Sequence, residues 1–485
     1  METHGSRNAA AGPGTTDLSA PGPGASAAAG GRLWVTAAVA IAAFLTTIDS
    51  TIVNVALPAI QRDLGMSLPG LQWVVTAYLL MFAALMLGGG QLADRYGSRR
   101  VLLGGLAVFT AASLSAGTAR SAAVLLASRA VQGAGAALVL PAALALVAAG
   151  RTARERDTGA AVWMAALATA LATGPVAGGW LSQHLGWHWI FLVNIPLGLA
   201  GLAAGAMAVR DAPRGRAPAV DVAGLAGSAT ALGAVTFALT EGPGLGWHSP
   251  AVLAAAGLAC AAAAWFGRAE RRSPAPMIDF ALVRERVVAG GMAASVLWGA
   301  GVNGILFFTS LFLQRAAGFS ATRTGLVFLP VAVFVVLVAP LTPAVAQRLG
   351  PARTVAAGLV LVAAGLAAVA LATRQVSFLR LLPGMITIGA GSALTVPLTT
   401  SVLAAVPAER AGVAGGLLGV AREASGLLGI SVLGLIVAGG RAVPPHGALP
   451  AGFARGYGLG LLAAAALVAL GAVIAGRTLP GPERP

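Results

Sequence analysis

Two ionisable residues, Asp49 and Arg129, lie inside apolar stretches that are long enough to cross a lipid bilayer. The run from Leu33 to Ile48, which precedes Asp49, holds no charge. An ionised side chain at the middle of a bilayer costs a few kcal/mol even on the most lenient scale, so such residues usually serve function. Carboxylates in this position are the usual proton carriers of pumps and transporters. The pair therefore predicts a membrane transporter that is driven by protons.

The two charges are predicted to lie at a similar depth. Asp49 precedes the outer end of the span predicted at 33–57 by about eight residues, or ~12 Å. Arg129 lies about as far from the outer end of the span predicted at 121–150, which runs in the opposite direction. Opposite charges at the same depth can pair across a cavity. Burial raises the pKa of an aspartate and a nearby arginine lowers it, so an acid under both influences can take up and release a proton. A static ion pair that holds two helices together is the alternative.

The bulk composition excludes an ordinary soluble protein. Hydrophobic residues make up 57% of the chain and charged residues only 10%, and the mean hydropathy is +0.84, whereas charged residues in soluble domains run near a quarter. The net charge of +15 comes from arginines scattered in short clusters between apolar segments, which is typical of cytoplasmic loops and not of a nucleic-acid binder. A single cysteine, Cys260, excludes a disulfide framework, and we expect no metal site.

Fourteen stretches meet the length of about 20 apolar residues that a transmembrane helix needs. We predict helices at 33–57, 70–92, 99–118, 121–150, 157–182, 188–208, 220–240, 249–267, 288–314, 324–347, 353–373, 377–405, 411–438 and 456–477. Arginine is concentrated in the loops that an inside N-terminus assigns to the cytoplasm, which favours both termini inside. The predicted fold class is an all-α polytopic membrane protein.

The loop Gly88–Arg100 (GGGQLADRYGSRR) has a weaker echo in Ala346–Arg353 (AQRLGPAR), which indicates an internal repeat. The first copy resembles the signature loop of the major facilitator superfamily, and a generic positively charged loop is the alternative. The residues that match are Leu92 and those to which the resemblance gives a gating role, namely Gly90, Asp94, Arg95, Gly97, Arg99 and Arg100. We expect Gly97 to permit a tight turn and the arginines to face anionic lipid or carbonyl ends of helices.

Two further motifs resemble the same superfamily. The span at 121–150 carries LxxxRxxQGxGAA, which begins at Leu125 and includes Arg129 and Gln132. The span at 157–182 carries a glycine–proline element that resembles the antiporter motif of the superfamily, formed by Gly174, Pro175, Gly178 and Gly179. Ala170 stands where this motif usually begins with glycine, and His188, in the segment that follows, stands where arginine is common. Glycines four residues apart are also common in plain helix packing, so antiport does not follow from this motif alone.

The sequence around Asp49 (IDSTIVNVALP) resembles the fourteen-helix drug–proton antiporter branch of this superfamily, as do QWVVTAYL in the second span and residues 313–330. The resemblance covers residues 33–477. It implies a major facilitator fold, with two six-helix bundles and two extra helices inserted between them. The corresponding domains are a disordered cytoplasmic tail at 1–32, bundles at 33–210 and 288–477, the inserted helices and a cytoplasmic loop at 211–287, and a tail at 478–485.

A second pair of charges, Arg422 and Glu423, lies about 15–18 Å from the cytoplasmic end of the span predicted at 411–438. In the branch that this chain resembles, an arginine here is usually followed by glutamine, so Glu423 departs from the pattern. Glu423 is therefore a candidate for a second protonation site or for a counter-ion to cationic substrates. Local neutralisation by Arg422 is an equally good interpretation.

The resemblance implies export of amphipathic compounds such as antibiotics, dyes and quaternary amines. A pocket for such molecules is expected to be apolar and aromatic with a few polar groups. Candidate lining residues are Asn54, Trp73, Tyr78, Gln132, Trp298, Asn303, Phe307, Phe308 and Gln314, although aromatic residues of membrane helices also face lipid or the protein core.

The predicted function is thus proton-coupled efflux of amphipathic drugs or antibiotics. We expect a monomer in the cytoplasmic membrane of a bacterium, of actinobacterial type. The expected partners are the substrate, protons and membrane lipid, with no nucleic acid and no cofactor besides the proton gradient. A dedicated exporter of an endogenous secondary metabolite is the main alternative. A membrane-embedded enzyme is disfavoured because the sequence shows no cluster of catalytic groups. A receptor would leave Asp49 and Arg129 without a function. An ATP-driven pump would need a G-x-x-x-x-G-K-[ST] loop, which the sequence lacks.

Overall fold

The computed structural model describes residues 23–150, 152–208, 221–273, 278, 280–407, 410–438 and 452–480, and in this part of the chain every regular element is a helix. The elements are α1 (Pro23–Leu64), α2 (Leu68–Tyr96), α3 (Ser98–Gly117), α4 (Ala122–Ala148), α5 (Ala153–His184), α6 (Trp189–Leu192), α7 (Asn194–Ala208), α8 (Val222–Leu245), α9 (Pro250–Arg272), α10 (Phe280–Arg284), α11 (Arg286–Leu311), η1 (Phe312–Ala316), α12 (Ala321–Val338), η2 (Ala339–Leu341), α13 (Thr342–Leu349), α14 (Pro351–Ala372), α15 (Phe378–Ala393), α16 (Val396–Ala404), α17 (Ala411–Ala438) and α18 (Phe453–Thr478).

The structure confirms fourteen stretches that are long and apolar enough to span a membrane, and each overlaps a predicted range. Four spans are interrupted where the sequence reads as continuous. In the ninth, α11 passes into the π-helix η1 at Phe312. The tenth and twelfth spans break near Pro340 and Pro397, because proline lacks the N–H that the helix interior requires. The sixth span splits at Val193 into α6 and α7.

The first helix begins at Pro23, inside the segment that was predicted to be a disordered tail. A proline at the first helical position and the alanines that follow favour helix, which explains the extension. Residues 1–22 and 481–485 of the two predicted tails lie outside the described residues.

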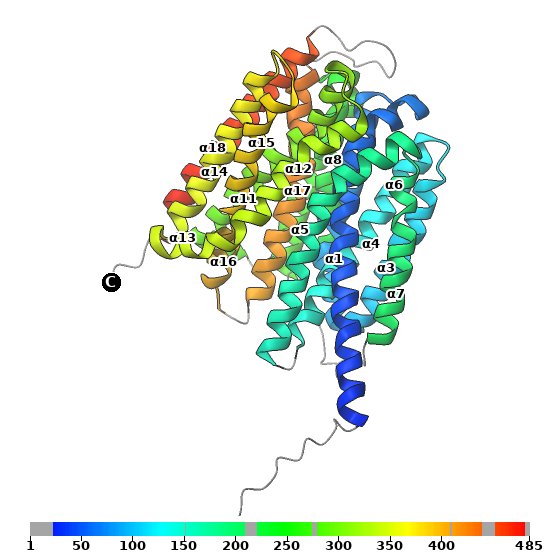
Figure 1. The fold of residues 1–485 in the computed structure, drawn as a ribbon, viewed down its shortest axis with the longest axis vertical. Coiled ribbons are helices and arrows are strands. Elements are labelled where there is room, and N and C mark those ends of the chain that lie inside the picture. Colours follow the sequence, from blue (N-terminus) through cyan, green and yellow to red (C-terminus); the bar gives the residue numbers. More distant parts are fainter. Residues whose placement is uncertain are drawn as a thin grey trace, which may run out of the picture.

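The two halves of the molecule repeat one packing pattern (Figure 1). In the first half α1 packs on α5 and α7, α3 on α4 and α7, and α2 on α4; in the second half the equivalent contacts join α11 with α17 and α18, α14 with α15 and α18, and α12 with α15. The halves meet through α5 with α12, α2 with α17 and α1 with α11, which are again equivalent pairs. The internal repeat expected from the two loops is therefore present in the helix packing.

The repeat extends to the backbone of the two loops. Gly97, between α2 and α3, has φ 94°, and Gly350, between α13 and α14, has φ 82°. Both values lie in the region that residues with a Cβ rarely adopt. The tight turn expected at Gly97 is confirmed, and its echo has the same conformation.

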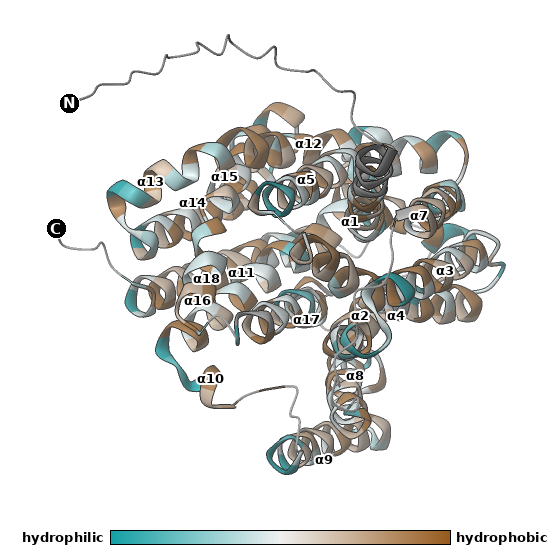
Figure 2. Cartoon of the chain, turned by 90° about the horizontal axis from the view of Figure 1, so that it is seen from below, coloured by the Kyte–Doolittle hydropathy of each residue, from teal (hydrophilic) through white to brown (hydrophobic). Residues whose placement is uncertain are grey.

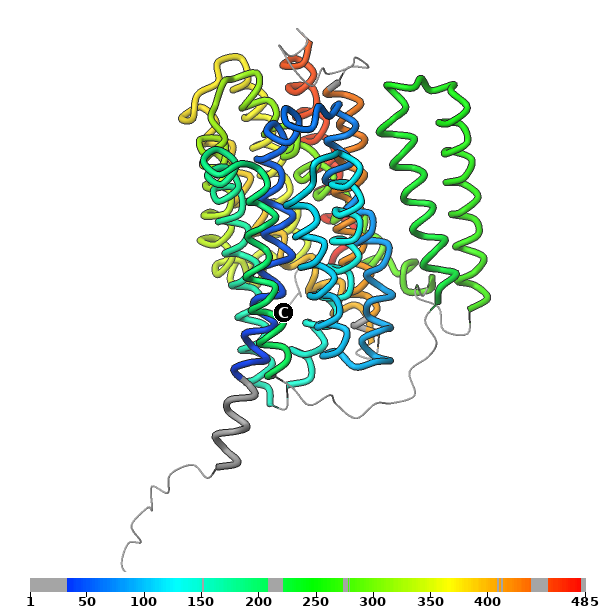
Figure 3. Tube along the Cα trace, turned by 90° about the vertical axis from the view of Figure 1, so that its right-hand side faces the viewer, coloured from blue at the N-terminus to red at the C-terminus, as the bar shows by residue number. Residues whose placement is uncertain are grey.

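The inserted helices α8 and α9 form a pair beside the main bundle (Figure 3). Only α8 contacts the bundle closely, against α2 and α17. The view from the end where α1 begins shows hydrophilic residues at the ends of α9 and α13 (Figure 2). We call this end cytoplasmic and the opposite end outer, following the arginine distribution.

Candidate functional site

The two charges that the sequence singles out form an ion pair inside the first half of the molecule. The Nη1 atom of Arg129 on α4 lies 2.5 Å from the Oδ2 atom of Asp49 on α1, and both side chains are 0% exposed. The pairing expected from their equal depth is therefore present. Because both charges are removed from water, the pair must be compensated by further hydrogen bonds.

Two uncharged side chains complete this site, which we call the Asp49 cluster (Asp49, Arg129, Gln132 and Asn194). The amides of Gln132 and Asn194 donate to Oδ1 of Asp49 at 3.2 and 2.8 Å. Arg129 also donates to the Gln132 side-chain oxygen at 2.9 Å and to the Val74 carbonyl at 2.9 Å. The carboxylate thus receives hydrogen bonds from three side chains, a surrounding that fits its ionised form.

The face of the Arg129 guanidinium is covered by an aromatic ring. Its central carbon lies 4.4 Å from the centre of the Tyr78 ring and 5.6 Å from that of Phe191, within the range of cation–π attraction. Gly133 permits this arrangement, because a Cβ there would overlap the Tyr78 carbonyl oxygen where α4 crosses α2. The Nη2 atom of Arg129 is buried and has no hydrogen-bond partner in the part of the chain that the structure describes.

Asn194 of the Asp49 cluster, and Ser113 beside the cluster, were not predicted as site residues. Asn194 begins α7, and Ser113 on α3 accepts a hydrogen bond from Gln132 at 2.7 Å. The available signal for Asn194 was a lone amide in an apolar span, which in a membrane usually finds a partner on another helix. Its partner cannot be read from the sequence, because that depends on which face of α7 packs on α1.

The second pair of charges lies in the other half, on α17. Glu423 is half-buried and has no hydrogen bond or salt bridge among the described residues, whereas the Arg422 guanidinium is exposed and lies 5.8 Å from the Trp298 ring centre. Glu423 lies between Gly419 and Gly426, which approach Met86 and Leu79 of α2. It therefore lies on the face of α17 that packs against the first half.

The candidate cavity residues fall into separate groups. Tyr78 and Gln132 contact Arg129, as described above. Trp298 and Asn303 are half-buried on α11, and no described residue forms a hydrogen bond with the Trp298 indole nitrogen. Asn54 is half-buried on α1 and donates to the Ser50 carbonyl at 3.3 Å.

The other candidates point elsewhere. Trp73 donates to the Glu241 carboxylate at 2.9 Å and thus faces the inserted helix α8. Phe307 is fully buried edge-on against Phe308, at a centroid distance of 4.8 Å. Gln314 donates to the Val55 carbonyl at 2.8 Å, which joins the two halves.

The antiporter motif on α5 lies where three helices meet. A Cβ at Gly178 would lie 2.5 Å from the Ile52 carbonyl oxygen of α1, and one at Gly174 would overlap Thr51. On the other side of α5, Gly179 abuts the Ala321 carbonyl and Gly325 abuts the Pro175 carbonyl. The motif therefore lets α5 pack at backbone distance on α1 within its own half and on α12 of the other half.

The halves are joined at the outer end. Besides the Gln314 bond, Arg315 donates to Gln61 at 2.6 Å, the Thr322 amide donates to Gln183 at 3.1 Å, and Gln72 donates to the Ile430 carbonyl at 3.1 Å. All of these residues lie in the outer parts of their helices. The structure thus represents a conformation that is closed at the outer end.

The signature loop lies at the cytoplasmic end. Arg99 donates to the carbonyls of Gly205 and Ala206 in the last turn of α7, at 3.1 and 2.6 Å, so it caps a helix C-terminus as expected. The guanidinium of Arg95 lies over the Tyr96 ring, and Arg95 and Arg100 are exposed.

The other residues of this loop differ in how closely they pack. Asp94 is exposed and has no hydrogen-bond or salt-bridge partner among the described residues. Gly90 is only partly buried, whereas its neighbour Gly89 abuts the Ala137 carbonyl of α4. The close approach of α2 to α4 is therefore made by Gly89 and not by Gly90.

Comparison with known proteins identifies the relatives of this chain. It is 38% identical to the multidrug resistance protein Stp of Mycobacterium tuberculosis (strain CDC 1551 / Oshkosh), over 83% of this chain and 75% of Stp. It is 34% identical to the tetracenomycin C resistance and export protein of Streptomyces glaucescens, over 84% of this chain and 76% of that protein.

The same fold occurs in a solved structure, that of the peptide transporter POT in complex with sulfate, with a TM-score of 0.68 at 16% identity over 93% of this chain and 96% of POT. The sequence model of the Major Facilitator Superfamily matches residues 39–430. These matches, the repeated helix packing and the fourteen spans agree with the expected fold of two six-helix bundles with two inserted helices. The chain is thus an integral membrane transporter and belongs to the Major Facilitator Superfamily.

Proposed function

We propose that this protein exports amphipathic drugs or antibiotics across the bacterial cytoplasmic membrane in exchange for protons, as a monomer and with no cofactor besides the proton gradient. The observation that carries the proposal is the Asp49 cluster, a carboxylate held out of water by an arginine and two amides. An intramembrane acid of this kind suits proton transfer, because its charge changes when water reaches it from one side or the other.

The geometry supports a specific sequence of events. In the outer-closed conformation, Asp49 is ionised and bound to Arg129, which fits the state after a proton has left to the cytoplasm and substrate can enter from inside. When the halves rock and the outer end opens, a proton from outside neutralises Asp49 and weakens its attraction to Arg129. Proton entry then accompanies substrate release, so each shifts the equilibrium between the two conformations.

The relatives support two alternatives for the substrate range, many drugs or a single antibiotic. Stp is a multidrug resistance protein, and the tetracenomycin C protein serves resistance and export of one antibiotic. A dedicated exporter of one secondary metabolite therefore stands beside a multidrug exporter. A resistance panel of chemically diverse compounds, in a host without exporters of its own, distinguishes them: one protected compound indicates a dedicated exporter, and several unrelated ones a multidrug exporter.

Proton coupling predicts gradient-dependent transport by the purified protein. In sealed vesicles, the compound that gives the strongest resistance should accumulate several-fold in an acidic lumen when the outer end faces the lumen. Nigericin, which dissipates the pH gradient, should lower accumulation to that of protein-free vesicles. Equal transport with neither a pH difference nor a voltage would refute proton coupling and leave the fold assignment intact.

Glu423, which has no hydrogen bond or salt bridge among the described residues, predicts that resistance depends on substrate charge. Glu423→Gln should lower resistance to cationic compounds several-fold and leave resistance to neutral compounds within twofold of wild type, because only cations are attracted to this half-buried carboxylate. Glu285→Gln, the same change at an exposed residue that precedes α11, is the control. Unchanged resistance to cations would assign Glu423 a structural role.

A further inference from the structure

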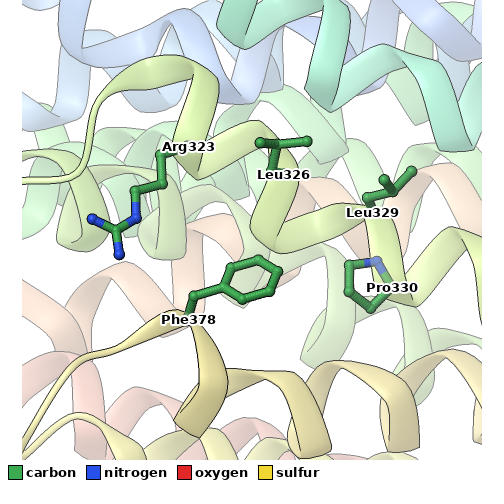
Figure 4. A pocket seen from close by; sticks show the side chains of 5 residues that line it. All are labelled: Arg323, Leu326, Leu329, Pro330 and Phe378. Atoms are coloured by element: carbon green, nitrogen blue, oxygen red, sulfur yellow. The ribbon is translucent and has the colours of Figure 1, made fainter.

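A hollow on the flank of the second half is separate from the Asp49 cluster. It lies between α12 and α15 and has a volume of about 390 Å³, at the small end of the range of roughly 300–1,000 Å³ for pockets that hold organic ligands. The residues that line it are Arg323, Leu326, Leu329, Pro330 and Phe378 (Figure 4). Four apolar side chains thus accompany one guanidinium.

The lining residues are ordered by depth along α12. Arg323 is the third residue of the helix, at its outer end. Leu326 and Pro330 follow on the same face, about 4.5 and 10.5 Å deeper at 1.5 Å per residue. The hollow therefore has a positive charge at the membrane boundary and an apolar wall that extends from it toward the bilayer centre. This order, charge first and hydrocarbon below, is that of a phospholipid with an anionic headgroup.

The charge of Arg323 is not balanced by the protein. Its side chain is exposed and lies 4.3 Å from the ring centre of Phe319, and it has no salt bridge among the described residues. The first turn of α15, on the other side of the hollow, adds another arginine, Arg380, whose guanidinium donates to Gln375 and forms no salt bridge within the described part of the chain. The rim is positive, and anionic lipid headgroups are attracted to such arginines at a membrane surface.

We propose that the hollow between α12 and α15 binds one anionic phospholipid of the outer leaflet. The headgroup phosphate accepts hydrogen bonds from Arg323, and an acyl chain lies along Leu326, Leu329, Pro330 and Phe378. Charge complementarity selects the anionic headgroup. Burial of the acyl chain in the hollow distinguishes this site from the general attraction of lipid to a positive surface.

The test measures lipid binding to the purified full-length protein by native mass spectrometry. Phosphatidylglycerol should bind at least fivefold more tightly than phosphatidylcholine with the same chains. Arg323→Gln should abolish this preference. Leu329→Trp, which fills the hollow and keeps the charge, should weaken binding of both lipids. The matched control is Arg455→Gln, because Arg455 is also an exposed arginine at the third residue of a helix at the outer end.

Each other result overturns the proposal. Equal affinity of the wild type for the two lipids removes headgroup selection, and an Arg323→Gln variant that keeps the preference removes Arg323 from the site. An equal loss in Arg455→Gln attributes the preference to surface charge alone. If inorganic phosphate competed as strongly as phosphatidylglycerol, the acyl chain of the lipid would not contribute to binding. Thermal unfolding of each variant without lipid shows that the variants are folded.

Discussion

Asp49→Asn is expected to lower energised efflux to the level of a host without the protein, because asparagine cannot take up a proton and Arg129 then keeps its charge without a counter-ion. Drug accumulation in cells and gradient-driven uptake in vesicles measure the loss. Asp157→Asn, the same change at an exposed aspartate at the cytoplasmic end of α5, should transport like wild type. Wild-type efflux by Asp49→Asn would remove Asp49 from the mechanism.

The same variant should also be less stable, and this effect needs separation from the loss of coupling. Breaking a buried ion pair by removing one partner typically costs about 3–5 kcal/mol, whereas removing both charges is often neutral. Asp49→Asn combined with Arg129→Gln should therefore unfold nearer the wild-type temperature and still fail to transport. Recovery of efflux together with stability in this double variant would make the pair a static structural element.

The sequence predicts the Asp49 cluster in part. Asp49 and Arg129 stand out because charge is rare in apolar spans, and the rise of a helix places them at one depth. Asn194 is a weaker signal than these charges, because uncharged polar residues are more common in membrane helices. Its contact with Asp49 depends on how α7 packs against α1, which is a property of the whole first half.

The direction of aromatic side chains is likewise set by the assembly. Trp73 matches a family motif, yet its indole faces Glu241 of α8, because the inserted helices cover this side of α2. Phe307 is buried within the second half. Local sequence determines which stretches become helices, and it fixes turns such as that at Gly97. Which face of a helix meets a cavity follows only when all helices pack together.

The contact between Gly179 on α5 and Ala321 on α12 supports a second prediction of large effect. The two residues touch at backbone distance in the outer-closed conformation, and a Cβ at Gly179 would overlap the Ala321 carbonyl oxygen. A backbone atom cannot rotate away as a side chain can. Gly179→Val should therefore hold α5 and α12 apart, prevent closure of the outer end and lower efflux to background. Gly104→Val on α3 is the control, because nothing lies within 4 Å of a Cβ built there.

A loss of closure is distinguished from misfolding by access to the interior. In a Cys260→Ala background, Ser50→Cys places a thiol beside Asp49 on α1, where a membrane-impermeant maleimide added from outside reports opening of the outer end. Labelling should rise several-fold in Gly179→Val and stay at the wild-type level in Gly104→Val. A Gly179→Val protein that is folded, inactive and labelled no faster than wild type would show that this glycine serves packing alone. Faster labelling would show that the backbone contact between α5 and α12 is what closes the outer end, so that closure depends on the absence of a side chain at Gly179.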